Sequence, residues 1–122
     1  MDYKSVNTIL YCRNWNETVD FYKNGMKLPE LFRNEWFVEF ELNSMARISI
    51  ANEAEASVRS SGGRGVTITI EITDLDQIYS VCCGSGLNPT EIKEHPWGGR
   101  VFYLFDPEGN RLEFWTANSK AE

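Results

Sequence analysis

The sequence is poor in cysteine, and its three cysteines form no recognisable framework. Cys12, Cys82 and Cys83 are odd in number, two of them are adjacent, and no Cys-x-x-Cys motif is present. A disulfide network or a redox-active pair is therefore not expected. The pattern instead predicts reduced thiols, buried as small hydrophobic side chains in a cytoplasmic protein.

Long hydrophobic runs are also missing. The longest apolar stretches are only a few residues, far short of the roughly 20 residues that a membrane-spanning helix needs. The segment Met1–Ser5 lacks the basic residues and apolar stretch of a secretory signal. The sequence thus predicts neither a transmembrane helix nor a signal peptide, and no membrane partner.

Basic residues are few relative to acidic ones: 12 Lys and Arg stand against 18 Asp and Glu, for a net charge of -6. No local Lys/Arg cluster offsets this balance, so a nucleic-acid partner is not expected. The same charge favours a cationic ligand over an anionic one at long range. Histidine is scarcer still, and the single His95 is interpreted as a residue at a loop edge.

Two halves of the chain show the same order of elements. In the first half, strand patterns cover Val6–Cys12, Glu30–Arg33, Trp36–Leu42 and Ala46–Asn52. A short helix is predicted between the first two strands, with polar capping candidates from Asn14 and with Gly25 as its C-cap. In the second half, strands are predicted at Val66–Ile72, Thr90–Glu94, Arg100–Phe105 and Arg111–Trp115.

The second half also contains a helix pattern, which Thr73 and Asp74 would cap and Gly84–Gly86 would end. Between the halves lies a polar stretch, Glu53–Gly65, which is interpreted as a Ser/Gly-rich linker. The 122 residues therefore predict a single domain of two βαβββ modules, about 1–56 and 64–117. Two curved sheets facing each other would enclose a cleft, where a ligand would bind.

Two segments resemble a known superfamily. Asn16–Leu28, with its Phe21-Tyr22 pair, and Gly98–Phe114, with the turn Asp-Pro-Glu-Gly-Asn at 106–110, are similar to the vicinal oxygen chelate proteins. These include glyoxalase I, bleomycin-resistance proteins, fosfomycin-resistance enzymes and extradiol dioxygenases. The resemblance implies an α+β fold of two tandem βαβββ modules with paired curved sheets around a cleft, and a homodimer.

Metal-dependent members of this superfamily take four ligands, usually His or Gln and then Glu. By resemblance the matching positions are Asn7, Ser49, Thr67 and Glu113. Only Glu113 is a plausible ligand, because neutral amide and hydroxyl oxygens hold a divalent ion poorly against water. No metal and no cofactor are therefore expected.

The resemblance points instead to the metal-free branch, typified by the bleomycin-resistance proteins. These proteins sequester a bulky, cationic or aromatic small molecule, which associates the branch with antibiotic resistance. The residues expected to contact the ligand share the strand faces of the four matched positions or come from the aromatic loop: Asn7, Tyr11, Arg47, Ser49, Thr67, Thr69, Trp97, Arg111, Glu113 and Trp115.

Several alternatives stay open at this point. The protein could be a glyoxalase-type lyase or isomerase, similar to lactoylglutathione lyase, or a dioxygenase relative, in which a degenerate metal site uses Glu113 as base or sole ligand. It could also be a regulatory module with a side-chain-filled cleft. Glu113 could equally be an ion-pair partner of Arg111 or Arg47, and each tryptophan could pack at a rim or a dimer interface.

Overall fold

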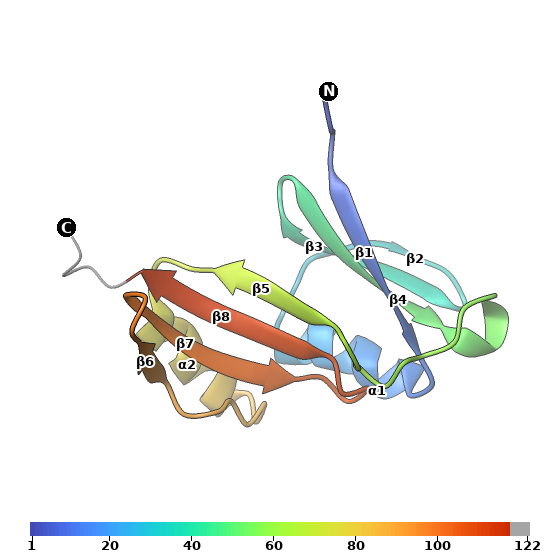
Figure 1. Ribbon diagram of the computed structural model, residues 1–122. Helices are drawn as coiled ribbons and strands as arrows, with labels where there is room; N and C mark the ends of the chain where they lie inside the picture. Colours follow the sequence, from blue (N-terminus) through green and yellow to red (C-terminus); the bar gives the residue numbers. More distant parts are fainter. Residues whose placement is uncertain (118–122) are drawn as a thin grey trace. The chain divides into compact units, whose positions relative to one another are not determined.

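The computed structural model describes residues 1–117, which form two compact units, Met1–Gly62 and a second one that begins at Gly63. Each unit contains one four-stranded sheet and one principal helix (Figure 1). The predicted α+β fold of two βαβββ modules is confirmed. That the two modules behave as a single domain around a shared cleft stays a prediction.

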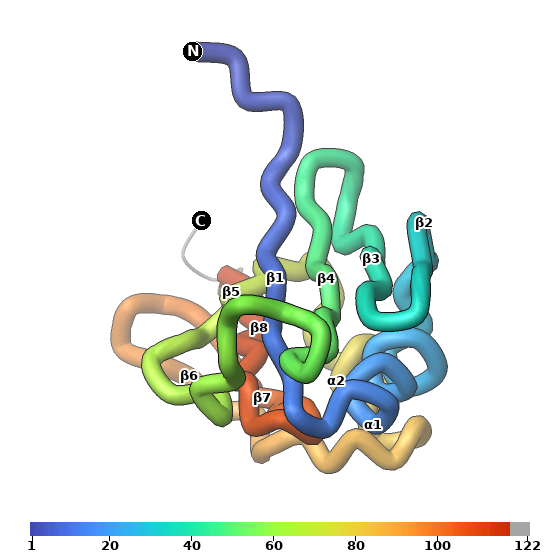
Figure 2. The backbone as a smooth tube through the Cα atoms, turned by 90° about the vertical axis from the view of Figure 1, so that its right-hand side faces the viewer, coloured from blue at the N-terminus to red at the C-terminus, as the bar shows by residue number. Residues whose placement is uncertain are grey.

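The first unit is built from four strands and one helical segment. Its elements in chain order are β1 (Val6–Cys12), α1 (Trp15–Asp20) with the π-helical turn η1 (Phe21–Gly25), β2 (Glu30–Arg33), β3 (Phe37–Asn43) and β4 (Ala46–Asn52). The strand order is β1-β4-β3-β2, with β1 and β4 parallel and the other neighbours antiparallel (Figure 2).

Alternation along the strands decides which face of this sheet receives the helix. Val38, Phe40, Ile48 and Ile50 are fully buried on one face. The Tyr22 ring of η1 is also fully buried and lies 6.3 Å from the Phe40 ring. The period-two pattern that was visible in the sequence therefore forms the core of the first unit.

The end of the first helix differs from the prediction, because Gly25 is not a left-handed C-cap. The backbone widens into a π turn instead: the Met26 amide donates to the Phe21 carbonyl at 2.8 Å, and Leu28 donates to Tyr22 at 3.0 Å. The left-handed residue is Lys27, with φ of 57°. The π turn thus extends the helical segment through Gly25, and the left-handed residue is found two residues later than predicted.

The second unit repeats this plan. It consists of β5 (Thr67–Glu71), α2 (Leu75–Gly84), β6 (Lys93–His95), β7 (Gly99–Phe105) and β8 (Arg111–Ala117), with strand order β5-β8-β7-β6. The predicted cap of α2 is confirmed, since the Asp74 side chain accepts a hydrogen bond from the Gln77 amide. Tyr79 of α2 packs edge-on against Phe102 of β7, with ring centroids 5.2 Å apart.

Two expectations for this unit need correction. The strand predicted at Thr90–Glu94 is observed at Lys93–His95, so that His95 is its last residue, at the edge of the turn that follows. The alternation of apolar residues along the predicted strand Val66–Ile72 favours a buried core position for Ile68 and Ile70, but both are half-buried. The reason is that β5 is an edge strand of its sheet, whereas Leu112 and Phe114 of the central β8 are almost fully buried.

The turn between β7 and β8 is fixed by one buried carboxylate. Asp106 accepts three hydrogen bonds of 2.9 Å, from the backbone amides of Glu108 and Asn110 and from the Asn110 side chain. This turn sets the antiparallel register of the two strands, in which Tyr103 lies opposite Glu113.

The polar stretch after β4 is less of a free linker than its composition suggests. It begins with a short 3-10 turn, η2 (Glu53–Glu55). The Glu53 carboxylate then accepts a hydrogen bond from the Ser60 amide at 2.8 Å, and Arg59 donates to the Glu53 and Ala56 carbonyls. The first part of the stretch is therefore anchored within the first unit.

All three cysteines are free thiols. Cys12 and Cys82 are buried as predicted, but Cys83 is exposed. Cys82 falls on the apolar stripe that begins at Leu75, so the next residue along α2 turns toward solvent. Over residues 1–117, neither helix has the length and apolar character required to cross a membrane.

Candidate functional site

Strand pairing brings four of the expected ligand-binding residues together on the second sheet. They lie on its polar face, defined here as the face opposite α2. Thr67 pairs with Arg111 and Thr69 with Glu113 across the parallel strands β5 and β8. Arg111 Nε donates to Thr67 Oγ1 at 2.9 Å, and Thr69 Oγ1 donates to Glu113 Oε1 at 2.6 Å.

Tyr103 belongs to the same face, although the sequence reasoning missed it. Its hydroxyl donates to Glu113 Oε2 at 3.3 Å, and the Arg111 guanidinium lies 4.6 Å from the centre of its ring. Both oxygens of Glu113 thus accept a hydrogen bond, and no ion pair joins Glu113 to Arg111 in the part of the chain described. The signal was available, because alternation along the strand after Val101 places Tyr103 on this face.

An aromatic cluster continues the polar face toward β6. Trp97 contacts Trp115 edge-on with ring centroids 5.6 Å apart, and the His95 ring stacks on Trp97 at 5.7 Å. Trp97 is nevertheless 59% exposed. Its ring lies directly over Gly99, where an added Cβ would come within 1.9 Å of Trp97 Cζ3. Only glycine at position 99 leaves room for this placement of the indole.

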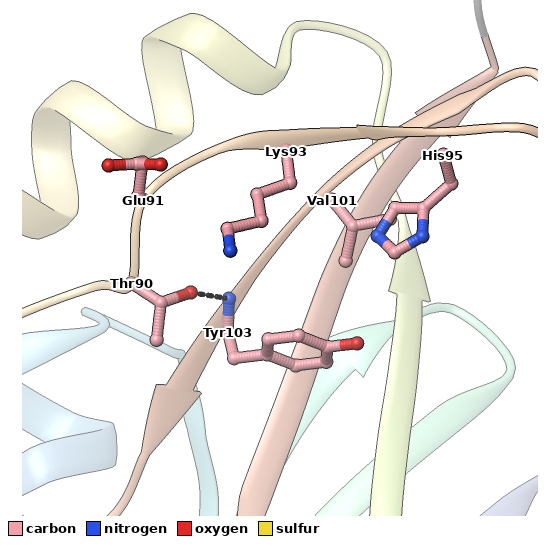
Figure 3. A pocket seen from close by; sticks show the side chains of 6 residues that line it. All are labelled: Thr90, Glu91, Lys93, His95, Val101 and Tyr103. Atoms are coloured by element: carbon pink, nitrogen blue, oxygen red, sulfur yellow. Dashed lines mark hydrogen bonds between the residues drawn. The ribbon is translucent and has the colours of Figure 1, made fainter.

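A cavity of about 260 Å³ opens beside this cluster, at the edge of the sheet (Figure 3). Val101 and Tyr103 of β7 provide its apolar surface, and Lys93 and His95 come from β6. Thr90 and Glu91 of the preceding segment complete the lining. None of these six residues was expected to contact a ligand. The strand of Lys93 and His95 was predicted too early, at Thr90–Glu94, and the alternation along β7 was not extended to Val101 and Tyr103.

A second cavity of the same unit, about 380 Å³ in volume, lies at the start of α2. The cationic side chain that lines this cavity is that of Arg100, which donates two hydrogen bonds to the Asp76 carboxylate at 3.0 and 3.1 Å. This pair raises the pKa of Arg100 and lowers the pKa of Asp76. The charge of Arg100 is therefore already neutralised within the protein.

The remaining expected residues form their own group on the first sheet, on the face opposite α1. Ser49 is fully buried and donates to the Asn7 side-chain oxygen at 2.8 Å. Arg47 forms an ion pair with Glu39 at 3.3 Å, and its buried Nη1 atom has no hydrogen-bond partner among residues 1–117. Tyr11 lies on the same face, next to Ala51 of β4.

The residues at the four positions matched to metal ligands do not fit a divalent ion. Asn7 and Ser49 are hydrogen-bonded to each other, Thr67 accepts from Arg111, and Glu113 is occupied by Thr69 and Tyr103. Neutral amide and hydroxyl donors are also weak ligands for zinc, nickel or iron. Within the described residues, no three His, Cys, Asp or Glu side chains are grouped to hold a metal ion.

Comparison with solved structures finds the same fold in several proteins of low sequence identity. A glyoxalase/bleomycin resistance protein/dioxygenase from Nocardioides superposes with a TM-score of 0.79 at 18% identity, covering 98% of this chain and 85% of the other. The lactoylglutathione lyase of Agrobacterium tumefaciens gives a TM-score of 0.74 at 16% identity, covering 91% of each chain.

A superfamily member from Sphaerobacter thermophilus gives a TM-score of 0.75 at 20% identity, covering 95% of this chain and 98% of that one. A comparison with functionally curated proteins gives no significant match. The sequence model of one superfamily, however, matches residues 5–114, which is most of the chain. The protein belongs to the glyoxalase/bleomycin resistance protein/dioxygenase superfamily.

Proposed function

We propose that this protein binds an aromatic small molecule on the polar face of its second sheet, without a metal ion and without chemical conversion. The observation that carries the proposal is the aromatic cluster of His95, Trp97 and Trp115 beside the cavity at β6. This makes the protein similar in function to the metal-free, bleomycin-resistance-like branch of its superfamily.

The exposed indole of Trp97 supports the proposal most directly. A large aromatic side chain that is 59% exposed loses the benefit of burial. Here the face of the Trp97 ring packs on the backbone of Gly99, and the ring also contacts Trp115 edge-on. A fixed, exposed indole offers a ready stacking surface for a planar or cationic ligand, at a low cost in side-chain entropy.

The polar residues around the cluster would orient the ligand. Thr67, Thr69, Arg111 and Glu113 are held in place by hydrogen bonds to one another or to Tyr103. On the first sheet, Asn7, Tyr11, Arg47 and Ser49 are proposed as a separate set of ligand contacts, and the buried Nη1 of Arg47 has no hydrogen-bond partner among residues 1–117. Since the matched ligand positions do not fit a divalent ion, sequestration is favoured over metal-dependent catalysis.

The test is a thermal-shift screen of protein purified without chelator, combined with elemental analysis. The screen compares aromatic compounds and bleomycin with Ni²⁺, Zn²⁺ and Mn²⁺. The aromatic compounds include cations, because the net charge of -6 predicts a cationic ligand. A ligand that binds the native state raises the melting temperature. At a ligand concentration of a hundred times the Kd, it adds about 2.7 kcal/mol to the free energy of unfolding. We expect aromatic compounds to stabilise the protein and metals to have no effect.

Two variants make the screen specific. Trp97→Ala should abolish the response to the aromatic compounds, whereas Phe32→Ala, which removes an aromatic ring that is 51% exposed on the first unit, should preserve it. Stoichiometric metal in the purified protein, or stabilisation by metals alone, would overturn the proposal. It would instead favour a glyoxalase-type lyase or dioxygenase relative that uses Glu113.

Two further parts of the proposal concern the whole protein. A cytoplasmic location is proposed because all three cysteines are free thiols, which a reducing compartment maintains. A homodimer is proposed because isologous pairing is the commonest oligomeric arrangement. Light scattering coupled to gel filtration tests the dimer, and a mass of 14.0 kDa would contradict it.

A further inference from the structure

The cavity at the edge of the second sheet is lined by one ammonium group, Lys93, and one carboxylate, Glu91. The Lys93 side chain lines it and forms no ion pair with any carboxylate in residues 1–117. Each described ion pair involves some other cation. The cavity thus presents an ammonium group that has not been neutralised within its own unit, in contrast to Arg100 at the neighbouring cavity.

The one carboxylate in the lining points elsewhere. In Figure 3 the Glu91 carboxylate lies beside α2, whereas the Lys93 ammonium extends on the other side of the segment toward Tyr103. Glu91 is also near Tyr79 of α2: burial raises the pKa of Tyr79, and the charges of Cys83 and Glu91 add to that effect. Glu91 therefore faces the helix side and leaves the charge of Lys93 uncompensated.

The nearby acidic residue of the polar face is also occupied. Glu113 accepts from Thr69 and from Tyr103, and Arg111 lies over the Tyr103 ring. The Tyr103 ring is consequently flanked by cations, Arg111 at its face and Lys93 across the cavity. Lys93 is therefore available to a carboxylate ligand, even though the chain as a whole carries a net charge of -6.

The other groups of the cavity suit an organic anion. The Thr90 hydroxyl accepts from the Tyr103 amide at 2.8 Å, which leaves its hydrogen free to donate. The His95 ring nitrogens have no hydrogen-bond partner within the described chain, and the ring is held by stacking on Trp97. Val101 and the Tyr103 ring offer apolar contact, and about 260 Å³ is just below the size of drug-like sites.

We propose that this cavity binds a small aromatic carboxylate, with the carboxylate at Lys93 and Thr90 and the ring against Val101 and Tyr103. This inference rests on the proposed function and names its ligand class. An anionic ligand thus replaces the cationic ligand that the net charge predicts. The ammonium group in direct contact with the ligand outweighs the distant charges of the chain, because salt screens those beyond about 8–10 Å.

The test uses three probes of nearly identical shape: benzoate, neutral benzamide and the benzamidinium cation, with acetate as a fourth. Each is titrated into the ¹⁵N-labelled full chain, and amide chemical-shift changes give both the binding site and the Kd. We expect benzoate to bind more tightly than benzamide and benzamidinium to bind least. The largest shifts should fall on Lys93, His95, Val101 and Tyr103.

Substitution of Lys93 separates charge from shape. Lys93→Gln should weaken benzoate about fivefold, as expected for a partly exposed ion pair, and leave benzamide unchanged. Lys93→Arg should restore most of the benzoate affinity. Lys4→Gln is the matched control, because it removes the same charge from an exposed position on the first unit and should change nothing.

The outcomes distinguish this inference from the function on which it rests. If benzamidinium binds best, or Lys93→Gln leaves benzoate binding intact, the carboxylate assignment is wrong while aromatic binding stands. Equal binding of acetate and benzoate would mean a simple anion site and would also overturn it. If aromatic compounds stabilise the protein through Trp97 but shift no amide of the cavity, this inference alone fails. If no aromatic compound of any charge binds, both fail.

Discussion

Tyr103 and Glu113 lie opposite each other on the antiparallel strands β7 and β8, and the Tyr103 hydroxyl donates to Glu113 Oε2 at 3.3 Å. With Thr69 bound to the other oxygen, the pair fixes the only carboxylate found at a position matched to a metal ligand. Glu113, which the resemblance matches to a metal ligand of the metal-dependent members, is held by these two hydrogen bonds on the same sheet face as Trp115 of the aromatic cluster.

Removal of the Tyr103 hydroxyl tests this relationship. Tyr103→Phe should lower the free energy of unfolding by about 1 kcal/mol or less, because one partly exposed hydrogen bond to a carboxylate is lost. Urea denaturation followed by circular dichroism measures the change. Tyr11→Phe is the control, since no hydrogen bond of the Tyr11 hydroxyl is found within residues 1–117. Equal effects of the two substitutions would show that the Tyr103 bond contributes nothing.

The turn before β8 should be among the most sensitive sites of the second unit. Asp106→Ala removes three hydrogen bonds from a residue that is almost fully buried. We expect a loss of about 3 kcal/mol, because the freed donors would stay partly desolvated. Asp74→Ala, which removes only one helix-capping bond, should cost about 1 kcal/mol. Similar losses for both would argue against the role assigned to Asp106.

Two glycines offer a matched comparison of backbone strain and crowding. Gly63 and Gly65 have similar positive φ values of 83° and 76°, but an added Cβ would lie 2.1 Å from the Gly109 oxygen only at Gly63. Both alanine substitutions carry the strain of the left-handed backbone, of about 1–2 kcal/mol. Gly63→Ala should cost about 2 kcal/mol more, because overpacking is added. Equal melting temperatures for the two variants would contradict this close approach.

The adjacent cysteines should differ sharply in reactivity. Burial raises the pKa of Cys82 to about 11, and the neighbouring Cys83 adds to the shift. Cys83 is exposed. Iodoacetamide at pH 8 should therefore modify Cys83 and leave Cys82 intact in the folded protein, as peptide mass spectrometry can show. Modification of both cysteines at equal rates in native buffer would contradict this difference and would indicate local opening of α2.

The contact between β7 and α2 predicts a dependence on pH. The hydrogen bonds from Arg100 lower the pKa of Asp76, so the pair stabilises the fold above the usual pKa of an aspartate and loses that contribution as pH falls through the lowered value. The melting temperature of Asp76→Asn should lie below that of the wild type at pH 7. The gap should close in acid. A gap that is constant from pH 7 to pH 2.5 would exclude this origin.

Local patterns determined much of the fold, because the side-chain period of a strand is independent of its partners. The buried positions of Val38 and Phe40 follow directly from alternation, the strand Val6–Cys12 follows from its β-branched residues, and Asp74 follows from the chemistry of a helix cap. Alternation placed Thr69 with Thr67 on one face of their strand and Arg111 with Glu113 on one face of theirs, and the register of β5 and β8 brings the two pairs together. The superfamily resemblance, rather than periodicity, supplied the expected function.

The tertiary structure decided what depends on contacts between distant parts of the chain. Three features need a strand register or a close approach that no local pattern encodes. They are the π turn at Gly25, the hydrogen bond between Tyr103 and Glu113, and the packing of the Trp97 ring over Gly99. The cavity at Lys93 and His95 was missed for the same reason. An edge strand of three residues is too short for alternation to fix its bounds, and only pairing with β7 places both side chains on the polar face.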